Sequence, residues 1–352
     1  MSGTGETAKT AAWNACRYLG VNRIAHWRMR RQLLVLCYHG VVAQPKRDRF
    51  RHATTVSVAE FEEHLDAIAK HFTPISGREL IAWYEGGAKL PDYPLLVTFD
   101  DGYRNNLTLA APALLQRKIP CVFHVTTGYI GTPRLLWTDE VISRVMAWPL
   151  DIVPLPEGGE ARLPEDGPER RRLASACKER CKRIPWSEAR AYLTRLRQSG
   201  MGLLSNGEVF GFLNWDEVRE LRRLGFEIGS HTVEHPILTQ LPPEELQTEL
   251  IESKRRIERE TGAPCVSIAY PNGGGNDFSA SVMEGAREAG YRLAFTIVEE
   301  FNRGPEQPMA VNRLCIMGHL PVSFFHFRVN GAARLLNRFG GKDRSLAVAR
   351  ER

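Results

Sequence analysis

Short apolar segments that alternate with amphipathic ones constrain the fold of this chain more than any other feature. Eight short runs rich in β-branched or aromatic residues, each bounded by turn residues, are predicted strands: 33–38, 72–75, 95–99, 121–126, 226–230, 265–270, 292–297 and 310–316. Apolar residues at helical spacing lie between many of them, at 58–70, 106–117, 216–224, 243–261 and 279–289. This alternation favours an α/β fold with a parallel sheet, and eight strands predict a (β/α) barrel, whether fully closed, distorted or incompletely closed.

Residues 131–210 interrupt this alternation. They contain no predicted strand, a stretch rich in Pro, Gly and Glu at 154–168, and charged helical patterns near 169–183 and 187–199. We interpret 131–210 as a helical insertion at the barrel mouth that forms a lid or a substrate wall. The alternative is a separate small helical domain, for which the apolar content of the segment is low.

The segment Val97-Thr-Phe-Asp-Asp-Gly-Tyr103 carries the strongest chemical signal. An apolar strand leads directly into two adjacent carboxylates, Asp100 and Asp101, and then into a glycine. Two neighbouring aspartates at a strand end repel each other and lose hydration, so such a pair normally needs a cation or a shared proton. Taken alone, the segment also fits a polar turn in which Asp is the turn former and Gly102 is left-handed.

A second motif, Gly229-Ser-His-Thr-Val-Glu-His-Pro236, also follows a short predicted strand. His231 and His235 are four residues apart, so within one helical turn their imidazoles would share a face. Neutral imidazole is the commonest metal ligand, and two histidines with one carboxylate leave coordination positions open for water and substrate. Two surface histidines before a proline turn are the simpler interpretation of this motif alone. Both motifs, however, fall at the carboxyl ends of predicted strands, where barrel active sites assemble.

Two further strand ends add weaker signals. Ile268-Ala-Tyr-Pro-Asn-Gly273 predicts a tight turn that exposes backbone N–H groups, which can face a developing oxyanion. His39 follows the first predicted strand and would point into the same barrel mouth. His319 and His326 lie near the last predicted strand, and a lone histidine there can be either structural or part of the site. The other five histidines are interpreted as structural: His26, His52, His64, His71 and His124.

Together these motifs resemble carbohydrate esterase family 4, the polysaccharide deacetylases built on the NodB homology domain. Thr98-Phe-Asp-Asp-Gly102 is similar to the first family motif, and His231-Thr-Val-Glu-His235 is similar to the second. Tyr270-Pro-Asn-Gly273 resembles the third motif in relatives that open with a Tyr-His strand, such as Tyr38-His39 here. The resemblance covers residues 33–130 and 211–325.

The resemblance implies roles for individual residues. Asp101, His231 and His235 would hold a divalent metal, with zinc expected, and Asp100 would be the general base. The backbone near Tyr270 would contribute to the oxyanion hole. The residues expected to contact the substrate or the oxyanion are Tyr270, Asn272, Tyr103 and Trp215.

The sequence departs from the family pattern in two places. Many members carry an arginine that orients the base a few residues before the third motif, but Cys265-Val-Ser-Ile268 contains none. Many also carry a C-terminal Leu-x-x-His that supplies the general acid, and Arg313-Leu-Cys-Ile-Met-Gly-His319 matches it only approximately. The acid is therefore either His39 or His319. We favour His39, because the N-terminal histidine can occupy that place in the Tyr-His relatives.

These roles predict a metal-dependent hydrolase that removes an N-acetyl group from an amino sugar. The metal would polarise the acetyl carbonyl and lower the pKa of a bound water, Asp100 would take a proton from that water, and a histidine would protonate the leaving amine. The predicted substrate is an N-acetylated sugar or glycan: an oligosaccharide, a polysaccharide precursor or a lipid-linked sugar. An N-deformylase or linear-amide hydrolase is the alternative on the same barrel. A non-catalytic carbohydrate-binding protein is disfavoured, because it has no need of the complete set of core residues.

Charge and cysteine usage bear on partners and location. The barrel, expected to span 33–325, has a net negative charge between a basic N-terminal segment (1–32) and a basic tail (326–352), which argues against a nucleic-acid partner. Arginines interleaved with aromatic residues over 8–32 predict an amphipathic helix on an anionic membrane surface, with a solvated basic tail as the equal alternative. Seven cysteines without a CxxC pair, and an N-terminus without an apolar signal core, predict a cytoplasmic protein. If the N-terminal helix binds the membrane, the expected location is peripheral, on the inner membrane.

Overall fold

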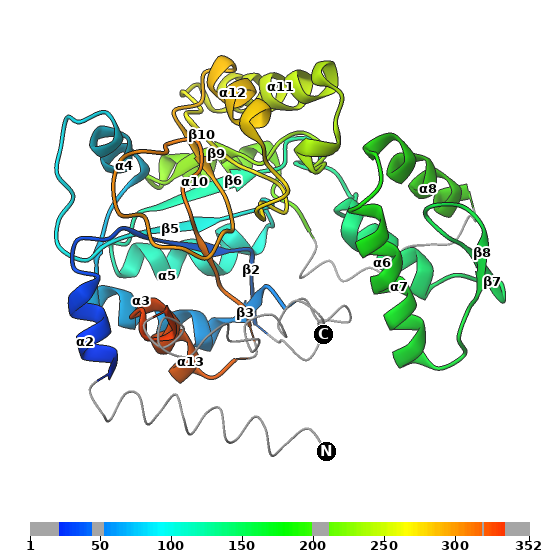
Figure 1. Ribbon diagram of the computed structural model, residues 1–352, viewed down its shortest axis with the longest axis horizontal. Coiled ribbons are helices and arrows are strands. Elements are labelled where there is room, and N and C mark those ends of the chain that lie inside the picture. The colour runs from blue at the N-terminus through cyan, green and yellow to red at the C-terminus, as the bar shows by residue number, and fades with distance from the viewer. Residues whose placement is uncertain (1–20, 44–52, 199–210, 319, 335–352) are drawn as a thin grey trace.

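The computed structural model describes residues 21–43, 53–198, 211–318 and 320–334. Strands form the centre of the molecule, helices pack around them, and the segment drawn in green extends to one side (Figure 1). The strands carry the apolar core, since every residue of β1 (Leu34–Tyr38) and β5 (Pro94–Phe99) is buried. Strands buried on both faces are typical of a parallel sheet covered by helices.

All eight predicted strands are present, and they join one parallel sheet. The other six are β4 (Thr73–Pro74), β6 (Cys121–Val125), β9 (Glu227–Ser230), β10 (Ser267–Ala269), β11 (Leu293–Phe295) and β12 (Leu314–Cys315). Their order is β11-β10-β9-β6-β5-β1-β12, with β4 paired to the start of β5. Phe295 of β11 also bridges to Val311, in the segment that leads into β12. The two ends of the sheet therefore meet, and the predicted barrel is confirmed in a distorted form.

Helices follow most of the strands, and local sequence sets where they begin and end. Those around the barrel are α2 (Val21–Arg28), α3 (Val58–His71), α4 (Gly77–Tyr84), a π-helix (Asn106–Ala110), α5 (Ala111–Gln116), α10 (Trp215–Arg223), a 3₁₀-helix (Leu238–Gln240), α11 (Pro243–Thr261), α12 (Ala280–Glu288) and α13 (Val322–Val329). Ser57, Ser76 and Asn214 begin α3, α4 and α10 with capping boxes. Gly262 ends α11 in the left-handed conformation. A small parallel pair, β2 (Gly40–Val42) and β3 (Thr55–Ser57), lies after β1.

Over its described residues, 131–198, the insertion contains three helices and a hairpin. Its elements are α6 (Trp137–Met146), β7 (Ile152–Pro154), β8 (Glu160–Arg162), α7 (Gly167–Cys181) and α8 (Trp186–Gln198). The antiparallel pairing of β7 with β8 shows that the prediction of no strand in 131–210 was wrong. These strands have three residues each, which is too short for a period-two pattern to stand out. Buried side chains such as Tyr192 and Leu196 belong to the same apolar cluster as the barrel core, so the insertion packs as part of the barrel domain.

The termini and the cysteines are described in part. Of the basic segment 1–32, the structure describes α2 and the turn after it, whereas residues 1–20 and 335–352 lie outside the described residues. No described helix is long and apolar enough to cross a membrane. The six cysteines within the described residues are all buried, as predicted, and none of them is in a disulfide.

Candidate metal centre and active site

A sharp turn after β5 sends the two adjacent aspartates to different partners. Asp101 (φ 75°) and Gly102 (φ 86°) are both left-handed, a conformation that Asp tolerates and Gly adopts freely. A Cβ on Gly102 would also lie 3.2 Å from the Val125 side chain. Asp100 and Asp101 are only 2% and 4% exposed. Two buried carboxylates thus leave the strand in different directions, and each needs its own compensation.

His231 and His235 lie in a loop, which corrects the predicted helical turn. Thr232 (φ 67°) and His235 (φ 58°) are left-handed, and Thr232 Oγ1 accepts a hydrogen bond from the His235 N–H at 3.1 Å. Glu249 of α11 accepts from the N–H groups of the two residues before His235, at 2.7 and 3.0 Å. These side-chain hydrogen bonds replace helical ones and bring the two imidazole centroids to 4.7 Å.

Asp101, His231 and His235 form a compact, buried cluster. Asp101 Oδ1 lies 3.5 Å from His231 Nε2 and 3.6 Å from His235 Nε2, and the three atoms lie within 4.8 Å of one another. Ligands of one tetrahedral ion are about 3.4 Å apart when each lies about 2.1 Å from it. His231 Nδ1 donates to the Ala269 carbonyl oxygen at 2.8 Å, which leaves the Nε2 lone pair facing Asp101. Burial lowers the pKa of His235 to about 3, so it is neutral, as a ligand must be. These residues fit a divalent metal.

Arg313 holds Asp100 through a two-point salt bridge. Its Nη1 and Nη2 donate to Asp100 Oδ1 and Oδ2 at 2.8 and 2.6 Å, and its Nε donates to the Thr296 carbonyl oxygen. Burial opposes ionisation of Asp100, but the Arg313 charge prevails and holds the pKa of the carboxyl well below its usual value. Arg313 was missed by sequence reasoning. It supplies the arginine contact to Asp100 that the resemblance led us to expect from the stretch before Tyr270.

His124 of β6 also faces Asp100, although it was interpreted as structural. Its Nδ1 lies 3.3 Å from Asp100 Oδ1, but the angle is not that of a hydrogen bond. Burial lowers the pKa of His124 to about 4, so the ring is neutral. The Cys37 thiol donates to Asp100 Oδ2 at 3.3 Å. Asp100 is thus enclosed by one cation and two neutral side chains.

His39 follows β1 and lines the same cavity as both aspartates. Asn106 of the π-helix donates from Nδ2 to the His39 carbonyl oxygen at 2.7 Å, so that helix fixes the backbone of His39. Burial alone would lower the pKa of His39, but Cys315, Asp101 and Asp100 raise it to about 9. The ring is therefore protonated at neutral pH and able to donate. His319, the alternative acid, lies outside the described residues.

The backbone near Tyr270 was predicted to contribute to the oxyanion hole, but the N–H of Tyr270 itself is already occupied. It donates to the Phe295 carbonyl oxygen at 2.9 Å as an extension of the sheet. The N–H of Tyr103 is an alternative oxyanion donor. Tyr103 pairs with Phe212 in an antiparallel bridge, and the hydrogen bonds of this bridge are made by the residues on either side of the pair. The central N–H of such a pair points away from the partner segment. Tyr103 also lines the cavity.

Asn272 and Trp215 differ in their placement. Asn272 lines the cavity in a left-handed conformation, and its Nδ2 donates to Asp277 Oδ2 at 2.6 Å, which braces the turn after β10. Trp215 begins α10, and the guanidinium of Arg256 lies 5.2 Å from its ring centroid. Asn272 therefore lies at the site, as predicted. Trp215 is not among the described residues that line the cavity.

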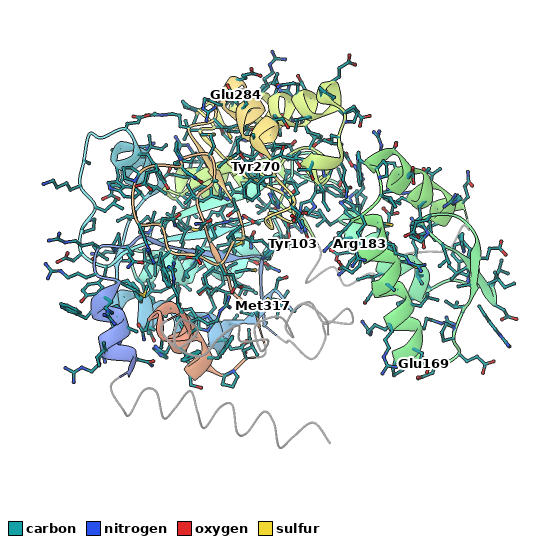
Figure 2. All side chains as sticks on the ribbon, viewed as in Figure 1. Tyr103, Glu169, Arg183, Tyr270, Glu284 and Met317 are labelled. Atoms are coloured by element: carbon teal, nitrogen blue, oxygen red, sulfur yellow. The ribbon has the colours of Figure 1, made fainter. Side chains whose placement is uncertain are left out.

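A cavity of about 230 Å³ lies over the cluster, between the barrel and the insertion. Figure 2 labels Tyr103 and Tyr270 on the barrel and Arg183 on the insertion. The insertion contributes several lining residues: Trp137, Thr138, Asp139, Ile142, Lys178 and Lys182. Trp137 Nε1 donates to the His235 carbonyl oxygen at 2.8 Å, and the Tyr103 hydroxyl donates to Asp139 at 3.3 Å. The insertion therefore forms one wall of the site.

A second cavity, of about 310 Å³, lies at the opposite end of the strands. Glu227 and Arg292 line it, and none of the residues predicted for the site does so. Active sites of (β/α) barrels form at the carboxyl ends of the strands, so the smaller cavity is the candidate site.

Two histidines and an aspartate at the carboxyl ends of parallel strands define a (β/α) barrel protein with a candidate metal centre. The model of the polysaccharide deacetylase family matches residues 87–294, more than half of the chain. The chain therefore belongs to the polysaccharide deacetylase family, which confirms the resemblance seen in its motifs.

Solved structures with this fold include two bacterial proteins. The Streptococcus pyogenes deacetylase PplD, in complex with acetate, is 17% identical with a TM-score of 0.55, and the match covers 84% of this chain and 97% of that one. IcaB from Ammonifex degensii is 21% identical with a TM-score of 0.54, over 85% of this chain and 96% of that one. At these identities the likeness shows the fold.

Curated relatives match over shorter stretches. Poly-beta-1,6-N-acetyl-D-glucosamine N-deacetylase of Escherichia coli (strain K12) is 25% identical over 114 residues, 32% of this chain and 17% of that protein. YxkH of Bacillus subtilis (strain 168) is 29% identical over 84 residues, 24% of this chain and 29% of that protein. The chain thus spans less than a third of the length of each of these relatives.

Proposed function

We propose that this chain removes the N-acetyl group from an amino sugar in an oligosaccharide, a polysaccharide precursor or a lipid-linked sugar. The observation that carries the proposal is an ionised, buried Asp100 beside the Asp101 cluster, in one cavity. Membership of the polysaccharide deacetylase family supports a carbohydrate substrate. A divalent metal held by Asp101, His231 and His235, with zinc expected, would polarise the acetyl carbonyl.

The chain's own residues supply the remaining chemistry. Asp100, held by Arg313, accepts a proton from the attacking water. The N–H of Tyr103 donates to the acetyl oxygen as negative charge develops there. His39 donates its proton to the nitrogen as the carbon–nitrogen bond breaks. The products are acetate and a free amino sugar.

The test is mass spectrometry of the protein loaded with one equivalent of zinc and incubated with N-acetylated oligosaccharides and lipid-linked sugars. Loss of one acetyl mass from a sugar supports the proposal and identifies the substrate. Matched N-formyl sugars and linear amides belong in the same panel. Turnover of those compounds alone would assign the barrel to a deformylase or a linear-amide hydrolase instead.

We expect His39→Ala to lower kcat by ~10²–10⁴-fold, the usual contribution of a general acid. Asn106 fixes the backbone of His39, the surroundings keep the ring protonated, and alanine cannot donate a proton. The measurement is kcat on the best substrate of the panel, beside His26→Ala, a histidine on α2 away from the cavity. A larger loss for His319→Ala than for His39→Ala would move the acid to the C-terminal motif.

We further propose that the protein is cytoplasmic and docks reversibly on an anionic inner-membrane surface through its basic N-terminal segment. In α2, Ile24 and Trp27 are 57% and 66% exposed, and arginines lie beside them. Trp favours the headgroup level, and each basic side chain near an anionic surface contributes about 1 kcal/mol. Docking would bring the barrel near a lipid-linked sugar.

We expect the full chain to float with liposomes that contain anionic lipid at low salt, and Ile24→Ser/Trp27→Ser to float much less. Substitution is preferable to deletion of the segment, because Ala25 and Met29 are buried in the core. Leu150→Ser, which removes an equally exposed apolar side chain from the insertion, is the matched control. If the wild-type chain stays in the soluble fraction, a soluble substrate is favoured.

A further inference from the structure

A second group of metal-ligating side chains lies beside the Asp101 cluster. Cys37, His39 and Cys315 each offer one ligand atom, and these atoms lie within 4.8 Å of one another. Cys37 is directly opposite Cys315 on the neighbouring parallel strands β1 and β12. Residues two apart on a strand share a face, so His39 lies on the same side as Cys37. The sheet itself therefore brings the three side chains together.

We propose that Cys37, His39 and Cys315 form a second metal site, distinct from the Asp101 cluster, that takes a thiophilic divalent ion such as Zn²⁺. Two thiolates and one imidazole are a common zinc ligand set, and they leave a fourth position for water. His39 and Cys315 line the cavity, so that position faces solvent. The site does not depend on the deacetylase reaction.

The surroundings of two of the three side chains, those of His39 and Cys315, favour an ion. His39 Nδ1 is buried and has no hydrogen-bond partner among the described residues, whereas buried polar atoms are normally satisfied. Arg328 donates to the Cys315 carbonyl oxygen at 2.9 Å, so a cation lies close to a thiol that must ionise. Binding would release the protons that these ligand groups carry. Two thiolates then balance the charge of the ion.

A metal fits this pair of thiols better than a disulfide does. Directly paired residues on neighbouring parallel strands keep their Cβ atoms about as far apart as the strands, about 4.7–4.9 Å. A disulfide needs a Cβ separation of about 3.5–4.5 Å. A bridge between Cys37 and Cys315 would pull two core strands together, whereas an ion between the sulfur atoms needs no such shift.

Occupancy of this site has a consequence for the reaction, and this step rests on the proposed function. An ion at Cys37 and Cys315 would use a ring nitrogen of His39, and His39 could then no longer donate its proton. Excess zinc should therefore inhibit the enzyme. Cys37→Ser/Cys315→Ser, which keeps the His39 ring, should resist that inhibition, measured as the fold-loss relative to the activity of the same variant without excess zinc.

The test is a titration of the reduced, metal-free full chain with Co²⁺. We expect two equivalents to bind, one of which gives a thiolate-to-cobalt charge-transfer band in the near ultraviolet. Cys37→Ser/Cys315→Ser should lose the band and one equivalent, while Cys265→Ser, a buried cysteine outside the group, should keep both. His235→Ala should keep the band and lose the other equivalent. A wild-type chain without the band, or a band that survives in the double variant, overturns the second site.

X-ray absorption of the wild-type chain loaded with two zinc ions tests the same point without any substitution. We expect an average of about one sulfur per zinc, at about 2.3 Å. Zinc with only nitrogen and oxygen neighbours would refute the second site. Both readouts are independent of catalysis. A thiolate signal in a chain without deacetylase activity would support the second metal site and contradict the proposed function. Deacetylase activity without a thiolate signal would support the proposed function and contradict the second metal site.

Discussion

Asp100→Asn should lose most of the turnover and keep the metal. The amide preserves the shape of the carboxyl group but cannot take a proton, and removal of a general base typically costs ~10²–10⁴-fold. Asp100 makes its closest contacts with Arg313, 2.6 and 2.8 Å away, and it is not one of the three clustered ligands. The measurements are kcat and zinc content of the same preparation.

The Asn variant also breaks a buried ion pair, so stability must be measured beside activity. Loss of one partner of such a pair costs ~3–5 kcal/mol, because the guanidinium of Arg313 stays buried without its counter-charge. Glu234→Gln is the matched control: it removes a carboxylate from within the His231 motif that pairs with Arg134 near the surface. A folded, zinc-loaded Asn variant with wild-type turnover would show that Asp100 is not the base.

Asp101→Ala, His231→Ala and His235→Ala should each lose the metal of the main centre and, with it, the activity. Each substitution removes one of only three protein ligands. Removal of a residue that only orients a metal ligand costs ~10–100-fold in metal affinity, and removal of a ligand itself should cost more. The lower affinity should appear as loss of the cobalt or zinc that resists chelation in the wild-type chain.

Metal content after dialysis against a chelator is the measurement, made on the Cys37→Ser/Cys315→Ser background so that only one centre is counted. His26→Ala in that background controls for removal of a histidine. Retention of one stoichiometric zinc in all three ligand variants would rule out Asp101, His231 and His235 as the centre. If only one of the three variants lost its zinc, only the residue substituted in that variant would remain assigned as a metal ligand.

Much of the fold could be predicted because its signals are local. The core strands are short apolar runs, and all eight pair in one sheet. Helix ends follow from side chains that cap their own backbone, as Ser57 and Asn214 do. The hairpin of the insertion was missed because each strand has three residues and only Val153 is buried in it.

The sequence by itself determined the parallel barrel, and it identified Asp101, His231 and His235 as candidates because both motifs follow strands whose carboxyl ends meet. It could not assign a partner to Asp100. That partner, Arg313, comes just before β12, which is brought near β5 by the strand order, since β12 pairs with β1 and β1 pairs with β5. The same pairing joins Cys37 to Cys315. Contacts between segments so distant in sequence depend on strand order, and strand order leaves no local pattern in the chain; only the tertiary structure decided them.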